Sequence, residues 1–433
     1  MSRRGSGATL SRVISVLSHL SVFGASALAV RATVDAVTTT WTAGLTTPLI
    51  AVLVGALLGG WLASRERGTV ALLIGLSGLV AVLVGDTFTS IEVFGASALW
   101  GLPHLLAGIV LAVIGVRAVV SRGLVACWFA GLVVTPLASS WLIQHTVGHL
   151  FVWIGIAALL ATVVTLAAVR LTLSTAPTST PFTSTTSTPA PPATNLKTLQ
   201  QLLLGVAAVT AAGPLVQPQH PTKDTHLAVL YCVLLVVAAF TLYTAGHLVL
   251  PGLAGIVMLG TVLVGTAYQV TVQLVQAQVS GVAGVFAIAG LVGAGAAVAG
   301  VYASVAVRRV VLLAGPAVAW LGLLGTLAVG NSPLLALWSV TVIAAGVGTT
   351  LGAGLPTAAI TAAIPTSTRT SAVLAGGLLV VSVIAGLKLG QGLRVLAMLT
   401  GRTSSDMAPY WFVSCSLVIA MTGLVGYRSR KAV

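Results

Sequence analysis

The chain repeats one pattern, in which apolar runs of about twenty residues alternate with short polar breaks. A run of that length forms a helix that crosses the ~30 Å hydrocarbon core of a bilayer. The runs are apolar on every side, whereas the strands of a membrane β-barrel alternate apolar and polar positions. Only 6% of the 433 residues are charged and 57% are hydrophobic, which leaves too few charges for a water-facing surface. The sequence therefore predicts an all-α integral membrane protein.

Fourteen spans are predicted. They lie at about 13–33, 46–64, 69–86, 94–116, 123–143, 148–171, 199–216, 226–246, 251–273, 281–304, 310–330, 333–357, 371–396 and 409–427. The run at 199–216 is short, and without it and its partner 226–246 the count is twelve.

The spans group into four predicted parts. A six-helix bundle covers residues 1–173, an extra helix pair covers 199–247, and a second six-helix bundle covers 248–433. Between the first bundle and the extra pair lies a linker at 174–198 that consists almost entirely of Ser, Thr, Pro and Ala. Such a segment has no apolar face to bury and is predicted to be disordered.

Basic residues predict the orientation, because they concentrate on the cytoplasmic side of membrane proteins. With both termini in the cytoplasm, 15 of the 20 basic residues fall on the inner side together with one acid, Glu66. The other five bases fall on the outer side with the other five acids. We therefore expect a multi-pass protein of the cell (inner or plasma) membrane. The basic charge marks topology and contact with lipid headgroups, and no nucleic-acid partner is expected.

A short sequence between the second and third spans resembles a family signature. Residues 59–68 read Gly-Gly-Trp-Leu-Ala-Ser-Arg-Glu-Arg-Gly. They resemble the G-x-L-A-D-R-x-G-R-R motif that the major facilitator superfamily carries at this turn. The resemblance implies a gating role for Gly60, Ser64, Arg65 and Arg67, although Ser64 stands where the family has Asp, which implies a weaker gate lock.

The fifth span carries a second resemblance. Gly131 and Pro136, followed by Ser139 and Ser140, are similar to the antiporter motif of exporters in that superfamily. Proline removes a backbone donor and bends the helix, and small residues permit close packing against the opposite half. Segments around Gln269 and Gln273, and farther on around 352–356 and 364–377, resemble the fourteen-helix drug–proton antiporter branch. The implied fold is a major-facilitator type with two six-helix bundles plus two extra helices.

The chain departs from that branch at its acids. Where the first span of proton-coupled members carries a carboxylate before a Thr-Val pair, this chain has Arg31 before Thr33 and Val34. No predicted helix centre contains Asp or Glu, and arginine stays charged at any working pH, so coupling through the usual carboxylates is not expected. His104 in the fourth span could titrate in their place.

Six residues are candidates for substrate binding or coupling, and each has a structural alternative. They are Arg31, Asp35, His104, Gln269, Gln273 and Lys388. Arg31 and Asp35 form either an interfacial ion pair or an anion contact in an outer cavity, and Lys388 either functions or snorkels to the outer surface. His104 is otherwise a hydrogen-bonded packing residue, and the two glutamines otherwise hold helices together.

The leading hypothesis is a membrane transporter, an exporter of amphipathic, lipophilic or anionic small molecules that works by alternating access. The alternative is a non-transporting scaffold or accessory subunit of a cell-envelope complex, which the missing acids favour. An enzyme is not expected, because no membrane-facing cluster of Asp, Glu, His or Cys could hold a metal or transfer protons. The three cysteines are isolated, at 127, 232 and 415. No cofactor is therefore expected.

Overall fold

A computed structural model describes residues 4–39, 47–64, 67–88, 101–118, 122–142, 148–175, 250–276, 278–279, 282–329, 332–354 and 407–432. All regular structure in these ranges is helical. Six of the described helices are long and apolar enough to cross a membrane, and five shorter apolar helices accompany them. The chain is therefore an all-helical, multi-pass membrane protein. The predicted count of fourteen spans and the predicted orientation stay predictions.

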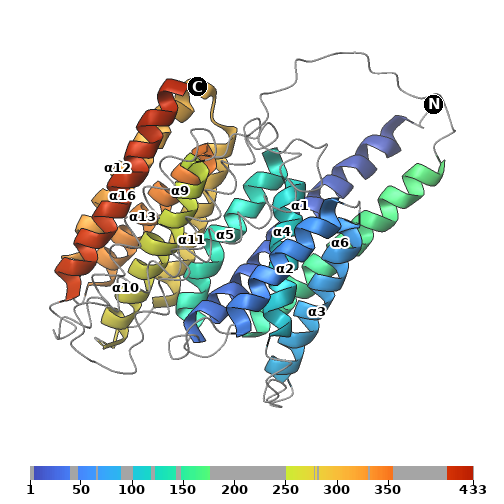
Figure 1. Cartoon of the computed structure of the whole chain (residues 1–433), viewed down its shortest axis with the longest axis horizontal. Coiled ribbons are helices and arrows are strands. Elements are labelled where there is room, and N and C mark those ends of the chain that lie inside the picture. Colours follow the sequence, from blue (N-terminus) through green and yellow to red (C-terminus); the bar gives the residue numbers. More distant parts are fainter. Residues whose placement is uncertain are drawn as a thin grey trace.

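The described helices form two groups, which we call the first half and the second half. The first half consists of α1 (Arg4–Thr39), α2 (Thr47–Ser64), α3 (Gly68–Phe88), α4 (Leu102–Ala118), α5 (Arg122–Leu142) and α6 (Gly148–Thr175). The second half consists of α9 (Leu250–Met258), the π-helix η3 (Leu259–Val264), α10 (Gly265–Gln276), α11 (Val282–Tyr302), α12 (Val305–Thr326), α13 (Pro333–Gly354) and α16 (Met407–Ala432). In Figure 1 the blue-to-green first half lies beside the yellow-to-red second half, with the start of α1 and the end of α16 toward the same edge.

Packing inside each half joins helices that are distant in sequence. In the first half, α1 packs against α4, α5 and α6, and α2 packs against α4. In the second half, α13 lies between α11 and α12, and α16 packs against α12 and α9. Glycines at these contacts allow the backbones to approach closely, as is common where lipid supplies no hydrophobic drive between helices.

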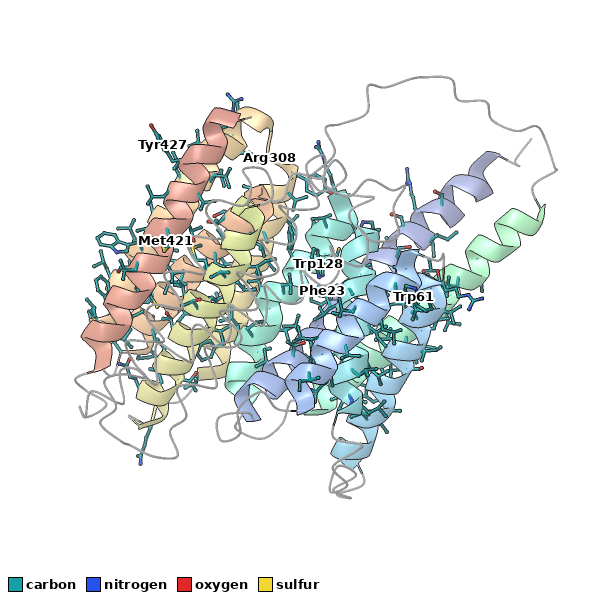
Figure 2. All side chains as sticks on the ribbon, in the orientation of Figure 1. Phe23, Trp61, Trp128, Arg308, Met421 and Tyr427 are labelled. Carbon is teal, nitrogen blue, oxygen red and sulfur yellow. The ribbon has the colours of Figure 1, made fainter. Side chains whose placement is uncertain are left out.

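The outward faces of both halves carry large apolar side chains. Trp153 is 65% exposed, Leu291 73% and Leu334 75%. Figure 2 shows such side chains projecting from the outer helices, with Trp61 on the first half and Met421 and Tyr427 on the second. In water such surfaces would drive association, whereas in a bilayer they contact acyl chains.

Several predicted boundaries differ from the structure. The fourth span was expected from residue 94, whereas α4 begins at Leu102, where Pro103 suits the first turn of a helix because it lacks an N–H to satisfy. The span expected at 310–330 is α12 and begins at Val305, because the Ser304 side chain accepts a bond from Val307 N and caps the helix. Arg308 and Arg309, which the predicted boundary left outside this span, are therefore the fourth and fifth residues of α12.

The span predicted at 251–273 contains a break in regular helix geometry. It is divided into α9, the six-residue η3 and α10. The predicted linker beyond Thr175, the helix pair at 199–247 and the span at 371–396 lie outside the described residues.

Candidate functional site

The two halves meet mainly through α5. This helix packs along α11 and also contacts η3, α10 and α13. Its other side packs against α1, where Gly131 faces the Ser26 side chain and Ser26 donates a 3.2 Å hydrogen bond to the Trp128 carbonyl. We call the contact of α5 with α11, η3 and α10 the junction. Movement of one half relative to the other changes this contact.

The two central helices of the junction run antiparallel. A methyl group built at Gly290 of α11 would lie 3.8 Å from Val134 Cα and 3.9 Å from Leu137 Cδ1, and one at Gly293 would lie 2.7 Å from Val133 Cγ1. Because the chain advances along α11 while it retreats along α5, the end of α11 lies near the start of α5. Gly293 of α11 thus packs against the Val133 side chain of α5, and at Gly290 the two helices leave room for a methyl group.

Both sides of the junction contain irregular helix. Pro136 lies inside α5, where it cannot donate a backbone hydrogen bond. On the other half, η3 contacts α5 and winds as a π-helix with five of its six residues buried. π-Segments inside α-helices are rare, and those that occur often lie at functional sites. A proline in α5 and a π-segment in an element that contacts α5 mark the junction as a place where helices can bend.

Three polar groups on the elements that border the junction are buried and have no hydrogen-bond partner among the described residues. They are Trp128 Nε1 on α5, Thr266 Oγ1 on α10 and Gln273 Oε1 on α10. Thr135 differs, because its hydroxyl bonds to Gly131 O of its own helix at 2.7 Å. A mostly apolar surface with a few unsatisfied donors and acceptors is the chemistry of a site for an amphipathic ligand.

Arg31 and His104 form a second polar group, inside the first half. The Arg31 guanidinium carbon lies 4.8 Å from the centre of the Phe151 ring of α6, a cation–π contact. His104 on α4 is 7% exposed, and its Nδ1 donates a 3.1 Å hydrogen bond to the carbonyl of Ala32, the residue after Arg31. These two contacts join α1 to α6 and α4 to α1, inside the first half.

The other predicted site residues fall at several places. Gly60 is buried in α2, Arg67 is exposed with its N–H bonded to Leu62 O at 3.1 Å, and Gly131 and Pro136 are buried in α5. Asp35, Ser64, Ser139, Ser140 and Gln269 lie within described helices, but their side chains lie outside the described set, and Arg65 and Lys388 lie outside the described residues altogether.

Some features of the junction had no signal in the sequence. Nothing in residues 259–264 distinguishes a π-helix from an ordinary apolar helix, and Thr266 is one of many threonines in apolar runs. Trp128 carries a signal in the sequence as an indole donor within the first third of a span, since a buried tryptophan N–H usually finds a partner.

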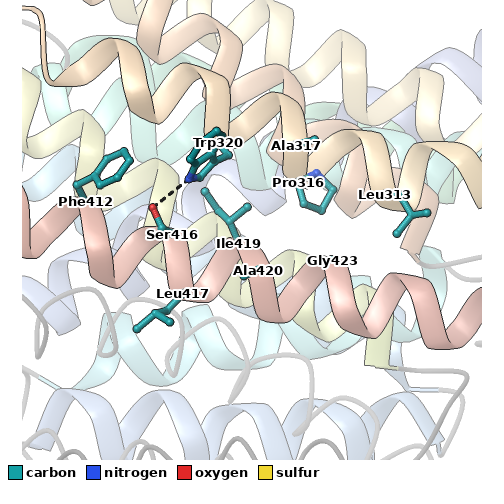
Figure 3. A pocket seen from close by; sticks show the side chains of 10 residues that line it. All are labelled: Leu313, Pro316, Ala317, Trp320, Phe412, Ser416, Leu417, Ile419, Ala420 and Gly423. Atoms are coloured by element: carbon teal, nitrogen blue, oxygen red, sulfur yellow. Dashed lines mark hydrogen bonds between the residues drawn. The ribbon is translucent and has the colours of Figure 1, made fainter.

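A groove lies away from the junction, between α12 and α16 on the second half (Figure 3). Its volume is about 600 Å³. Pro316 and Trp320 of α12 line it together with Phe412 and Gly423 of α16, and Trp320 Nε1 donates a 3.1 Å bond to Ser416 Oγ across it. The described residues contain no group of three or more His, Cys, Asp or Glu side chains that could bind a metal.

No family model and no curated protein matches the sequence. Among solved structures, the chain is similar to the proton:xylose symporter XylE bound to 6-bromo-6-deoxy-D-glucose, with 15% identity, a TM-score of 0.47, and coverage of 97% of this chain and 95% of that chain. It is also similar to an auto-inhibited POT family peptide transporter, with 12% identity, a TM-score of 0.48 and coverage of 96% of each chain. The human organic anion transporter MFSD10 (TETRAN) aligns with 15% identity, a TM-score of 0.48, and coverage of 95% of this chain and 99% of that chain. With every identity at or below 15% and every TM-score below 0.5, the function proposed next rests on the chain's own helices.

Proposed function

We propose that the protein is a membrane transporter that moves small molecules by alternating access between its two halves. Alternating access needs two bodies that are rigid inside and that can rock against each other around a central site. The observation that carries the proposal is a difference in packing: inside each half, Gly108 and Gly348 lie directly against a carbonyl of the neighbouring helix, whereas between α5 and α11 a methyl group built at Gly290 would have room, 3.8 Å from Val134 Cα.

The rigidity of each half follows from its glycines. A methyl group at Gly108 of α4 would overlap the carbonyl of Val52 in α2, and one at Gly348 of α13 would overlap the carbonyl of Gly293 in α11. Two helices packed this closely cannot slide along each other without steric collision between their atoms. The junction, with Pro136 and η3, is where the packing leaves room for movement.

The proposed substrates are amphipathic, lipophilic or anionic molecules, and the proposed direction is export. The elements that border the junction are mostly apolar and carry Trp128 Nε1, Thr266 Oγ1 and Gln273 Oε1, and groups of this kind can orient a polar substituent without binding a cation tightly. The absence of acids from the predicted helix centres disfavours cationic substrates.

A reversible cross-link across the junction tests the proposal. In a background in which the three native cysteines are replaced by alanine, Val134→Cys and Gly290→Cys bring two thiols within disulfide reach of each other, one on each half. Cells that express the protein are loaded with a lipophilic dye or a lipophilic anion, and efflux is followed. We expect oxidation to slow efflux by about tenfold or more, equal to ~1.4 kcal/mol on the rate-limiting barrier, and reduction to restore it.

The matched control is a cross-link inside the second half. A Cβ built at Gly423 of α16 would lie 4.0 Å from Pro316 Cβ of α12, so Pro316→Cys with Gly423→Cys also forms a disulfide but leaves the halves free. This pair should leave efflux unchanged on oxidation. Equal efflux from expressing and non-expressing cells for every compound tried would instead favour the scaffold.

Proton coupling through His104 has its own test. His104→Asn keeps a donor for the Ala32 carbonyl but removes the titratable ring. If this histidine carries the proton, the variant should fold normally and lose the part of efflux that an uncoupler abolishes. Uncoupler-sensitive efflux that survives in the variant would remove His104 from the mechanism.

A further inference from the structure

Three arginines lie close to the helix starts of α5 in the first half and α12 in the second half. Arg122 is the first residue of α5, and Arg308 and Arg309 are the fourth and fifth residues of α12. Arg122 is close enough to Arg308 to act on its charge, and Arg308 Nη2 donates a 2.7 Å bond to Val301 O at the end of α11. The antiparallel register of α5 and α11 brings these ends together independently. We call Arg122, Arg308 and Arg309 the arginine cluster.

The arginine cluster places positive charge where the helices already carry it. The N-terminal end of a helix bears a partial positive charge, so cations near the starts of α5 and α12 are unfavourable there. Arg308 Nε and Arg309 Nε are also buried and have no hydrogen-bond partner among the described residues. Guanidinium groups that repel each other and keep unused donors are set to bind an anion with several acceptor oxygens.

His19 adds a fourth group at the same end. Its ring packs against Gly123, the residue after Arg122, with the Nε2 edge toward α5. Its Nδ1 donates a 2.5 Å hydrogen bond to the Ser15 carbonyl, which leaves Nε2 as the ring nitrogen that faces the start of α5. The sequence places Glu66 as the single acid among fifteen bases on this predicted side of the membrane, so the compensating charge must come mostly from outside the chain.

We propose that the arginine cluster binds a phosphate group, and that this anion bridges the two halves at the end where α5 and α12 begin. Arg122 belongs to one half and Arg308 and Arg309 to the other, so the bound anion replaces repulsion between the halves with attraction to a shared ligand. The phosphate can come from an anionic lipid headgroup or from solution. Its binding stands whether or not the chain transports, whereas its control of the halves rests on the proposed function.

Two measurements test the site on the purified full chain. The first is the thermal midpoint in nanodiscs of phosphatidylcholine alone, of phosphatidylcholine with phosphatidylglycerol, and of phosphatidylcholine with inorganic phosphate in the buffer against chloride of equal ionic strength. The second is a spin-label distance between Val16→Cys on α1 and Tyr302→Cys on α11, two exposed positions on opposite halves. We expect phosphatidylglycerol to raise the midpoint and to shift the distances toward shorter values. The same shifts with inorganic phosphate would identify solution phosphate as a sufficient ligand.

Variants decide whether the cluster is responsible. Both shifts should be lost in a triple variant that combines Arg122→Gln, Arg308→Gln and Arg309→Gln. The single variant Arg122→Gln changes only the exposed arginine and leaves the buried donors of α12 in place, so both shifts should become smaller. Arg12→Gln removes an exposed arginine of α1 and should keep both. The proposal is overturned if neither anion shifts the wild-type midpoint, or if the triple variant responds as the wild type does. A shift of the thermal midpoint without a change in the spin-label distance would support the phosphate site and contradict its role in bridging the halves.

Discussion

Contacts inside the halves and the contact between them follow different packing rules. Inside the halves, Gly108 and Gly348 sit against backbone carbonyls of the neighbouring helix, with no room for one methyl group. Between the halves, a methyl group built at Gly290 would lie 3.8 Å from the nearest atom of α5, an ordinary van der Waals distance, and one built at Gly293 would meet only the Val133 side chain of α5. A contact made of backbone is fixed by the helices themselves, whereas a contact made of side chains can be exchanged for another by rotamer changes. Helices inside one half are therefore expected to stay together, whereas the two halves can move relative to each other.

The largest expected effect comes from adding a methyl group to each kind of contact. Gly348→Ala should lower stability by about 3 kcal/mol, because the methyl group meets a carbonyl that belongs to a rigid helix. Gly290→Ala should change it by less than about 0.5 kcal/mol. Thermal midpoints of the two purified variants in one detergent check the pair, and equal midpoints would break the comparison.

A smaller effect is expected at the polar groups that border the junction. Thr266→Val removes a buried hydroxyl that has no partner among the described residues, so stability should stay equal or rise by about 1 kcal/mol. If that hydroxyl contacts substrate, efflux should fall at the same time. The control is Thr271→Val, farther along α10. The Thr271 hydroxyl already donates a 2.7 Å hydrogen bond to Ala267 O, so this variant should leave the efflux rate unchanged. Unchanged efflux in both variants would remove Thr266 from the site.

The smallest effect concerns a side-chain hydrogen bond inside the first half. Ser21 Oγ of α1 and Thr162 Oγ1 of α6 lie 2.5 Å apart and are both buried. A double-mutant cycle with Ser21→Ala and Thr162→Val should give a coupling of about 0.6 kcal/mol, typical of hydrogen bonds between membrane helices. A coupling as large as the Gly348→Ala effect would show that side chains, and not backbone contacts, hold this half together.

The positions of the helices along the chain were far more predictable from the sequence than the packing of one helix against another. Runs of apolar residues set the positions of α2, α5 and α13 to within a few residues, because the bilayer requires that length and composition. Which helix meets which was not predictable, since an apolar helix in lipid has no polar face to mark its outer side. Gly108 is a typical membrane glycine in the sequence, and only the structure shows that Val52 faces it.

The site was predicted only in outline, for related reasons. Pro136 was identified because proline has one backbone consequence in any helix. The π-turn of η3 was not, because it depends on how α9 and α10 pack. The predicted start of the span at residue 310 left out Arg308 and Arg309, whereas the cap at Ser304 brings both into α12.

The π-helix has a consequence for the geometry of everything that follows it in α10. A π-turn holds one residue more than an α-turn, and one residue corresponds to a rotation of about 100°. Thr266 and Gln273 therefore point in a direction that a regular helix through Leu250 would not give them. Deletion of one residue from 259–264 would keep every side chain of α10 and aim each of them at a different neighbour.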